Sequence, residues 1–133
     1  MKIYLDIDET LLINDPNNRR PAPYLKEFLT NIINNHQAYW LTTHCMDGDA
    51  TVPTYFLGRF VDQDIKDLLI KIRPTKWSKF KIEAIDLTED FMWFDDMLFS
   101  EEEKILRDAG KLDSHIKVDL HKNPNFLKDY LNI

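Results

Sequence analysis

The segment from Lys2 to Thr10, KIYLDIDET, places two aspartates and a threonine at the end of a short apolar run. Asp6 and Asp8 are one residue apart, and two carboxylates so close repel each other unless a cation or a proton lies between them. The pair therefore predicts a metal site or an acid/base pair. The alternative interpretation is an ordinary turn in which Asp8 or Thr10 caps the next element.

Two further apolar runs end in polar residues of similar chemistry. Residues 38–43, AYWLTT, end in Thr42 and a second threonine, and residues 91–96, FMWFDD, end in Asp95 and Asp96. In open parallel sheets, ligands bind beyond the carboxyl ends of the strands. If these runs are neighbouring parallel strands, their polar ends converge on one crevice.

Strand-like segments alternate with helix-like segments along the whole chain. We expect a first strand at the start of the chain, and further strands over 38–42, 91–95 and 116–120. Helical spacing of apolar residues predicts helices over 22–35, 51–61, 64–72, 78–86 and 124–131. This alternation is typical of an α/β fold, here a three-layer Rossmann-like sandwich with a mostly parallel central sheet.

Three local features add to this pattern: a loop, a segment with two possible structures, and a helix with marked ends. Residues 11–21 are rich in Asn and Pro and are interpreted as a loop, and residues 70–73 could form a short strand instead of ending a helix. Ser100 and Glu103 form the pattern of a capping box that opens a helix, and Gly110 would close it.

Length and composition limit the possible functions. The 133 residues, 44% of them hydrophobic, fit one globular domain over 1–133. The net charge of -6 disfavours non-specific binding to nucleic acid or to anionic membranes. Cys45 is the only cysteine, and neither a signal peptide nor a membrane-spanning segment is recognisable, so we expect a cytoplasmic protein.

The order of these motifs resembles the haloacid dehalogenase superfamily, specifically its aspartate-dependent phosphatases. The likeness covers nearly the whole chain. It consists of a D-x-D-x-T motif, a strand ending in a threonine, a lysine at the start of a short helix in the sequence KIEAI, and a late acidic pair. In this sequence these motifs contain Asp6, Asp8, Thr10, Thr42, Lys81, Asp95 and Asp96.

The resemblance implies a fold like that of this superfamily and a covalent phosphatase mechanism. Asp6 would be the nucleophile that forms an aspartyl-phosphate, and Asp8 would be the general acid and base. Mg²⁺ would be bound by Asp6, by the backbone carbonyl of Asp8 and by one carboxylate of the late pair. We favour Asp96 as that ligand, with Asp95 assisting it.

The resemblance also implies roles in binding the phosphate. The hydroxyl of Thr42 would donate to a phosphoryl oxygen, while Thr43 would point to the opposite side of the strand. A lysine would bind the phosphate at the start of a helix, and we favour Lys81 over Lys79, with Lys76 behind both. Thr10 would order its loop. His44 and Cys45 lie just beyond, where they could line the site, but a loop role is favoured.

Members of the superfamily often carry a cap domain over the site. The segment after the first motif is too short for a cap, and residues 44–75 could form at most a small lid. An open site suits either a phosphorylated small molecule or an exposed phosphate on a macromolecule. We therefore keep a polynucleotide-end or phosphoprotein phosphatase as an alternative function.

A different class of function is a phosphate-binding module or a signalling receiver domain without turnover. Receivers carry their acidic pair on the first strand, whereas here a D-x-D motif comes first and Asp95 and Asp96 come late. Because only turnover needs an acid and base, the presence of Asp8 favours an enzyme.

Overall fold

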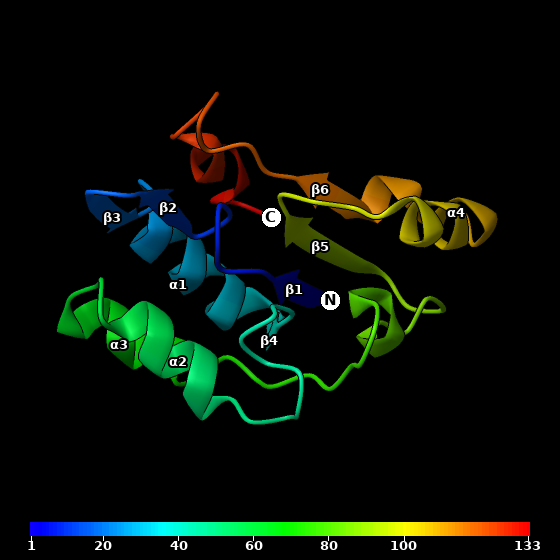
Figure 1. The fold of residues 1–133 in the computed structure, drawn as a ribbon, viewed down its shortest axis with the longest axis horizontal. Helices are drawn as coiled ribbons and strands as arrows, with labels where there is room; N and C mark the ends of the chain where they lie inside the picture. The colour runs from blue at the N-terminus through cyan, green and yellow to red at the C-terminus, as the bar shows by residue number, and fades with distance from the viewer.

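A four-stranded sheet lies at the centre of the molecule, with the strand order β4-β1-β5-β6 (Figure 1). The computed structural model describes all residues from 1 to 133. Every pair of neighbouring strands in this sheet is parallel, and Leu5 in β1 lies between Trp40 in β4 and Phe94 in β5. The strands are β1 (Lys2–Leu5), β4 (Gln37–Trp40), β5 (Phe91–Asp95) and β6 (His115–Lys117).

Helices connect the strands and cover the sheet. They are α1 (Leu25–Asn35), α2 (Thr51–Gly58), α3 (Gln63–Leu69) and α4 (Ser100–Asp108), with short 3-10 helices η1 (Lys81–Ala84), η2 (Leu112–Ser114) and η3 (Phe126–Tyr130). The predicted α/β class with a parallel central sheet is therefore confirmed. None of the helices combines the length and the apolar character that crossing a membrane requires.

The two faces of the sheet are buried under different helices. Side chains alternate along a strand, so Ile3 and Leu5 of β1 belong to one apolar cluster and Tyr4 belongs to the other. The larger cluster includes residues of α1, α3 and η3, and the smaller cluster includes residues of η1 and α4. The resulting three layers are consistent with a Rossmann-like arrangement.

Helix α1 is placed on the sheet by its apolar spacing. Leu25, Phe28, Leu29 and Ile32 are all buried, and they recur at the intervals that put side chains on one helical face. The helix begins three residues later than the predicted range 22–35, because Tyr24 adopts a left-handed backbone conformation with a φ of 67°.

Residues 44–75 belong to the body of the protein. Leu57 of α2, Ile65 and Leu69 of α3, and Ile72 are all buried in the larger apolar cluster. Helix α3 packs on α1, which itself lies on the sheet. The segment therefore forms part of a core layer, and the possibility of a lid over 44–75 is not supported. Of the possible strand at 70–73, only Arg73 is involved, through an isolated bridge to Tyr39.

The predicted loop over residues 11–21 is wrong, because the segment forms an antiparallel hairpin. Strand β2 (Leu12–Asp15) pairs with β3 (Asn18–Pro21) across a two-residue connection at 16–17. Leu12 and Ile13 are buried, Pro16 and Asn17 form the exposed connection, and Asn14 and Pro21 are half-buried within the two strands.

The start of α4 also differs from the prediction. The residue before its first turn is Phe99, whose backbone N–H donates to a carboxylate oxygen of Glu102 at 3.3 Å. The predicted capping box of Ser100 and Glu103 is therefore wrong. Glu102 is buried and its neighbour Glu103 is not, so it is the carboxylate of Glu102 that lies at the start of the helix. Gly110 follows the helix with a φ of 70°, as predicted.

Other elements are also shorter than predicted: α2 ends at Gly58 instead of 61, α3 ends at Leu69 instead of 72, and β4 ends at Trp40 instead of 42. Residues 78–86 contain only the 3-10 helix η1, and residues 124–131 contain only the 3-10 helix η3. Strand β6 covers His115–Lys117 instead of 116–120, although the N–H of Val118 still donates to the carbonyl of Asp95 at 2.9 Å.

The packing of α1 on the sheet yields a stability prediction. The ring of Phe28 is fully buried against the ring of Phe94, with 5.2 Å between their centroids. We expect Phe28→Ala to lower the free energy of unfolding by about 3 to 5 kcal/mol, because it removes buried apolar area and leaves a cavity. Chemical denaturation measures this change. The control is Tyr55→Ala at an exposed position, with an expected change within about 0.5 kcal/mol. Equal losses in the two variants would contradict the packing described here.

Candidate active site

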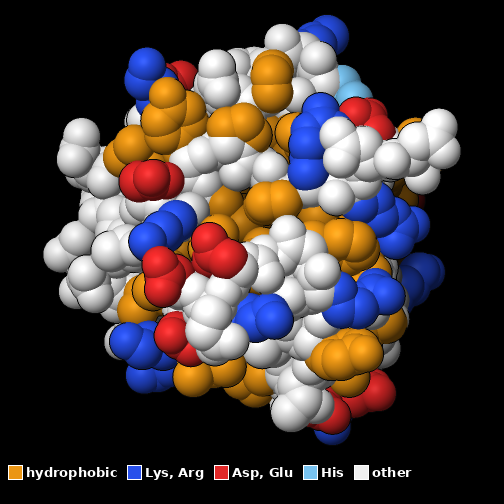
Figure 2. All heavy atoms as spheres, turned by 90° about the vertical axis from the view of Figure 1, so that its left-hand side faces the viewer, with side chains coloured by type: hydrophobic (Ala, Val, Ile, Leu, Met, Phe, Trp, Pro, Cys, Tyr) orange, Lys and Arg blue, Asp and Glu red, His pale blue; other side chains and the backbone are white.

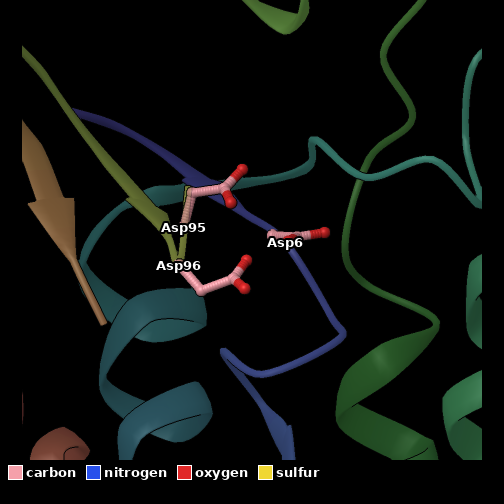
Figure 3. Close-up of side chains that lie close together, drawn as sticks. All are labelled: Asp6, Asp95 and Asp96. Carbon is pink, nitrogen blue, oxygen red and sulfur yellow. The ribbon is translucent and has the colours of Figure 1, made fainter. Parts of the chain in front are cut away.

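Three carboxylates meet where β1 and β5 end. Asp6 directly follows β1, its N–H donates to the carbonyl of Phe94 at 3.1 Å, and Asp95 is the last residue of β5. Asp6, Asp95 and Asp96 each offer an oxygen, and these oxygens lie within 4.8 Å of one another. Figure 3 shows the three side chains extending into one space beyond the strand ends. The predicted convergence of the strand ends is present for these residues.

Lys81 supplies the positive charge at this cluster. Its Nζ lies 2.6 Å from an oxygen of Asp95 and 3.4 Å from an oxygen of Asp6. Burial by itself would lower the pKa of Lys81, but the charges of Asp6 and Asp95 outweigh it and raise the pKa above its ordinary value. The lysine is therefore protonated at neutral pH and pairs with both buried carboxylates.

One lysine does not balance three carboxylates. Burial, and after it the nearby charge of Asp95, raise the pKa of Asp6 well above its ordinary value. The same two causes, together with a hydrogen bond to Asp95, raise the pKa of Asp96 to about 6. Excess negative charge in a buried place attracts a proton or a cation. Oxygen-only donors of this kind are those that Mg²⁺ prefers.

Asp95 and Asp96 differ in whether their carboxylate oxygens are already occupied by hydrogen bonds. Asp95 is almost fully buried, and its two oxygens already accept from Lys81 and from the backbone N–H of Met97. Asp96 is half-buried and forms no ion pair. Asp96 is thus the better placed of the two to bind a cation, while Asp95 holds the lysine.

The turn that carries Lys81 is held by two glutamates. The carboxylate of Glu83 accepts from the backbone N–H groups of Ser78, Lys79 and Phe80 at 2.7 to 3.1 Å. These hydrogen bonds lower the pKa of Glu83 to about 2. From α4, the carboxylate of Glu102 accepts from the N–H of Ile82 at 3.1 Å. A local contact and a long-range contact therefore position the lysine.

A tight turn after β1 determines where Asp8 lies. The carbonyl of Ile7 accepts from three successive backbone N–H groups, those of Thr10, Leu11 and Leu12. Glu9 adopts a left-handed conformation with a φ of 62°, which residues other than glycine and asparagine seldom do. Thr10 is fully buried in this turn, and its hydroxyl oxygen has no hydrogen-bond partner.

The side chain of Asp8 lies beside the carboxylate cluster and not within it. One oxygen accepts from the side-chain amide of Asn14 at 2.7 Å, and the other lies 2.7 Å from Nε2 of His44. Asp8 nevertheless lines the same cavity as Asp6 and Asp96. It is thus placed to exchange a proton with a group bound there.

The two threonines after β4 are placed differently from the prediction. Thr42 is fully buried, and its hydroxyl oxygen accepts from the N–H of His44 at 3.3 Å. Thr43 is exposed and lines the cavity, whereas it was expected to point away. The strand ends at Trp40, so the alternation of side chains that the prediction assumed does not extend to these residues.

The carboxylates open into a cavity of about 360 Å³, a size within the usual range for ligand sites. Lys79 lines it together with Lys81, whereas Lys76 does not. Apolar side chains also border it, namely Trp77, Met97 and Phe99. Figure 2 views the molecule from the side toward which the strands run, where acidic, basic and apolar side chains are intermixed.

Sequence reasoning missed two residues of this site. Asn14 lay within the segment interpreted as a loop, and for His44, which could line the site, a role in its own loop was favoured. The position of His44, two residues after Thr42 at the end of a strand, was the available signal. Nothing in the sequence pairs Asn14 with Asp8, because that contact depends on the hairpin.

Comparison of the chain with protein-family models, with curated proteins and with solved structures gave no match. The interpretation of the site therefore rests on its own geometry and chemistry.

The Glu83 contacts yield a prediction on pH dependence. Because the pKa of Glu83 falls from 4.5 to about 2 on folding, its contribution to stability is full above pH 4.5 and is lost as the pH falls toward 2. We expect Glu83→Gln to be less stable than the parent at pH 7, with the difference shrinking between pH 4.5 and 2. Thermal unfolding across this pH range measures it.

The matched control for this prediction is Glu101→Gln, at an exposed glutamate of α4 that holds no turn. At pH 7 it should lose only about 0.3 to 1 kcal/mol, the contribution of an exposed acidic group in the first turn of a helix, which is less than Glu83→Gln loses. A Glu83→Gln difference that stays constant down to pH 2 would show that its carboxylate charge does not hold the Lys81 turn.

Proposed function

We propose that this protein is a Mg²⁺-dependent phosphatase of the haloacid dehalogenase type, which hydrolyses a phosphomonoester through an aspartyl-phosphate. The observation that carries the proposal is the meeting of Asp6, Asp95 and Asp96 within 4.8 Å beside Lys81, at the carboxyl ends of two neighbouring parallel strands. Phosphoryl transfer requires an in-line nucleophile, neutralisation of the phosphoryl oxygens and an acid for the leaving group.

Asp6 would be the nucleophile. An oxygen of its carboxylate would form a bond to phosphorus as the bond from phosphorus to the ester oxygen breaks. Lys81 contacts one Asp6 oxygen, which restrains the side chain; the same oxygen would also face the cation, which leaves the other oxygen for attack. The buried position of Asp6 keeps water from solvating the nucleophile.

Asp8 would move the protons. In the first step it would give a proton to the leaving alcohol, and in the second it would take a proton from the water that attacks phosphorus and releases Asp6. Its place beside the carboxylate cluster, in the same cavity, supports this division of roles.

The carboxylate cluster fits a hard divalent cation. Asp6 and Asp96 and the backbone carbonyl of Asp8 would hold it, while Asp95 remains paired with Lys81. When bound, Mg²⁺ would neutralise the phosphoryl oxygens and reduce their repulsion of the nucleophile. The raised pKa values of Asp6 and Asp96 support a cation here, because burial and the nearby Asp95 disfavour their ionised forms unless a cation compensates the charge.

The substrate would be a phosphorylated small molecule or an exposed phosphate on a macromolecule. The intermixed charges on the face that contains the strand ends, and the net charge of -6, do not favour a polynucleotide end. The apolar border formed by Trp77, Met97 and Phe99 fits a leaving group with apolar surface.

The nucleophile gives the first functional prediction. We expect the protein to hydrolyse an aryl phosphate with Mg²⁺, to lose activity with a chelator, and to regain it with added Mg²⁺. Asp6→Asn should lower kcat by at least about 10³-fold, because an amide cannot form the acyl phosphate. Steady-state assays measure this, with Asp113→Asn on η2, outside the cavity, as control. Activity of Asp6→Asn at the level of the parent would exclude the covalent mechanism.

Substitution of Asp8 tests whether the protein is an enzyme or a receiver-like module without turnover. Asp8→Asn keeps its backbone carbonyl, so we expect it to retain Mg²⁺ binding while kcat falls by about 10² to 10⁴-fold. With an activated aryl phosphate the first step needs little acid help, so a phosphoryl group should accumulate on Asp6. Mass spectrometry after a short incubation, with hydroxylamine treatment, detects it. Turnover equal to that of the parent would mean that Asp8 is neither acid nor base.

A further inference from the structure

His44 makes three contacts that fix its imidazole ring next to Asp8. Its backbone N–H donates to the hydroxyl oxygen of Thr42, and its ring stacks on the ring of Phe56 with 3.9 Å between centroids. Its Nε2 lies 2.7 Å from the Asp8 carboxylate. The first two contacts restrain the backbone and the ring plane, so the direction of Nε2 toward Asp8 is set by α2 and by the end of β4.

The Asp8 carboxylate is held from two sides. Asn14, on the hairpin, donates to one oxygen and His44 contacts the other. A carboxylate bound at both oxygens does not rotate freely about its last side-chain bond. Asp8 must donate a proton to the leaving alcohol and then accept a proton from water at nearly the same position. It needs such restraint, because a small misplacement of a reacting group slows a reaction strongly.

The imidazole suits both protonation states of Asp8. When Asp8 is ionised, an Nε2–H can donate to the nearer carboxylate oxygen, and when the other oxygen carries the proton for the leaving group, the same Nε2–H can still donate to the nearer one. The contact can therefore persist through the whole reaction cycle.

We propose that His44 is a positioning residue that orients the Asp8 carboxylate for proton transfer through its Nε2 contact. This inference rests on the proposed phosphatase function. The competing explanation is that His44 only packs against Phe56 and supports its own loop.

Two matched variants separate these explanations. His44→Gln keeps an amide that both donates and accepts near the position of Nε2, but loses the ring. His44→Phe keeps a ring that can stack on Phe56, but loses the hydrogen bond. Positioning through Nε2 predicts that Gln retains kcat within about threefold of the parent and that Phe lowers it by about tenfold or more. A packing role predicts the reverse order.

The leaving group provides a readout that a packing defect would not change. The ratio kcat/KM reports the steps up to formation of the phosphoryl-enzyme, in which an alkyl phosphate needs a proton from Asp8 and an activated aryl phosphate needs little. His44→Phe should therefore lower kcat/KM at least about fivefold more for an alkyl phosphate than for the aryl phosphate. A partly misfolded sample would lower both equally.

The contact itself is tested without activity. We compare ¹⁵N NMR spectra of the parent and of Asp8→Ala. The Nε2 resonance of His44 should shift between the two, while those of His36 and His115 stay in place. An unmoved resonance overturns the inference. So does an active parent in which the Gln variant is impaired as much as the Phe variant. A parent that hydrolyses no phosphoester, with or without Mg²⁺, overturns the proposed function, and the inference falls with it.

Discussion

Repulsion among the carboxylates of Asp6, Asp95 and Asp96 is the constraint on which the other features of the site depend. Three acidic groups this close are stable in a folded protein only when positive charge or protons compensate them. Lys81 supplies part of that charge, and its turn is tied down by Glu83 and Glu102. The elements that precede and follow β5 in the chain thus cooperate to place one ammonium group, and the negative charge that remains is uncompensated within the cluster.

The central part of this arrangement could be predicted from sequence because it depends on few assumptions. Apolar runs ending in carboxylates indicate parallel strands, and the ends of neighbouring parallel strands lie at one edge of the sheet. Strand β5 has the predicted bounds, and Asp6 and Asp95 lie at adjacent strand ends. Lys81 was the favoured one of three lysines, and it is the one that contacts both of these carboxylates.

What sequence could not give depends on turns and on distant contacts. The left-handed conformation of Glu9 directs the chain into the hairpin, and without the hairpin nothing connects Asn14 to Asp8. The choice between Thr42 and Thr43 depends on where β4 stops, which apolar spacing does not define. Glu102 was not distinguished from its neighbour Glu103, because only the packing of α4 buries one of them.

The pairing of β1 with β5 also has a consequence for how the protein folds. Asp6 and Asp95 lie far apart in the sequence, and their strands are neighbours only through a long-range parallel pairing. While the chain is unfolded, Asp6 is far from Asp95 and Asp96 and all three are well solvated, so the repulsion between Asp6 and the other two costs little. That cost arises only when the two strands join, at a stage when η1 can deliver its lysine. A fragment that lacks the segment of β1 or that of β5 would therefore contain neither the complete carboxylate cluster nor its mutual repulsion.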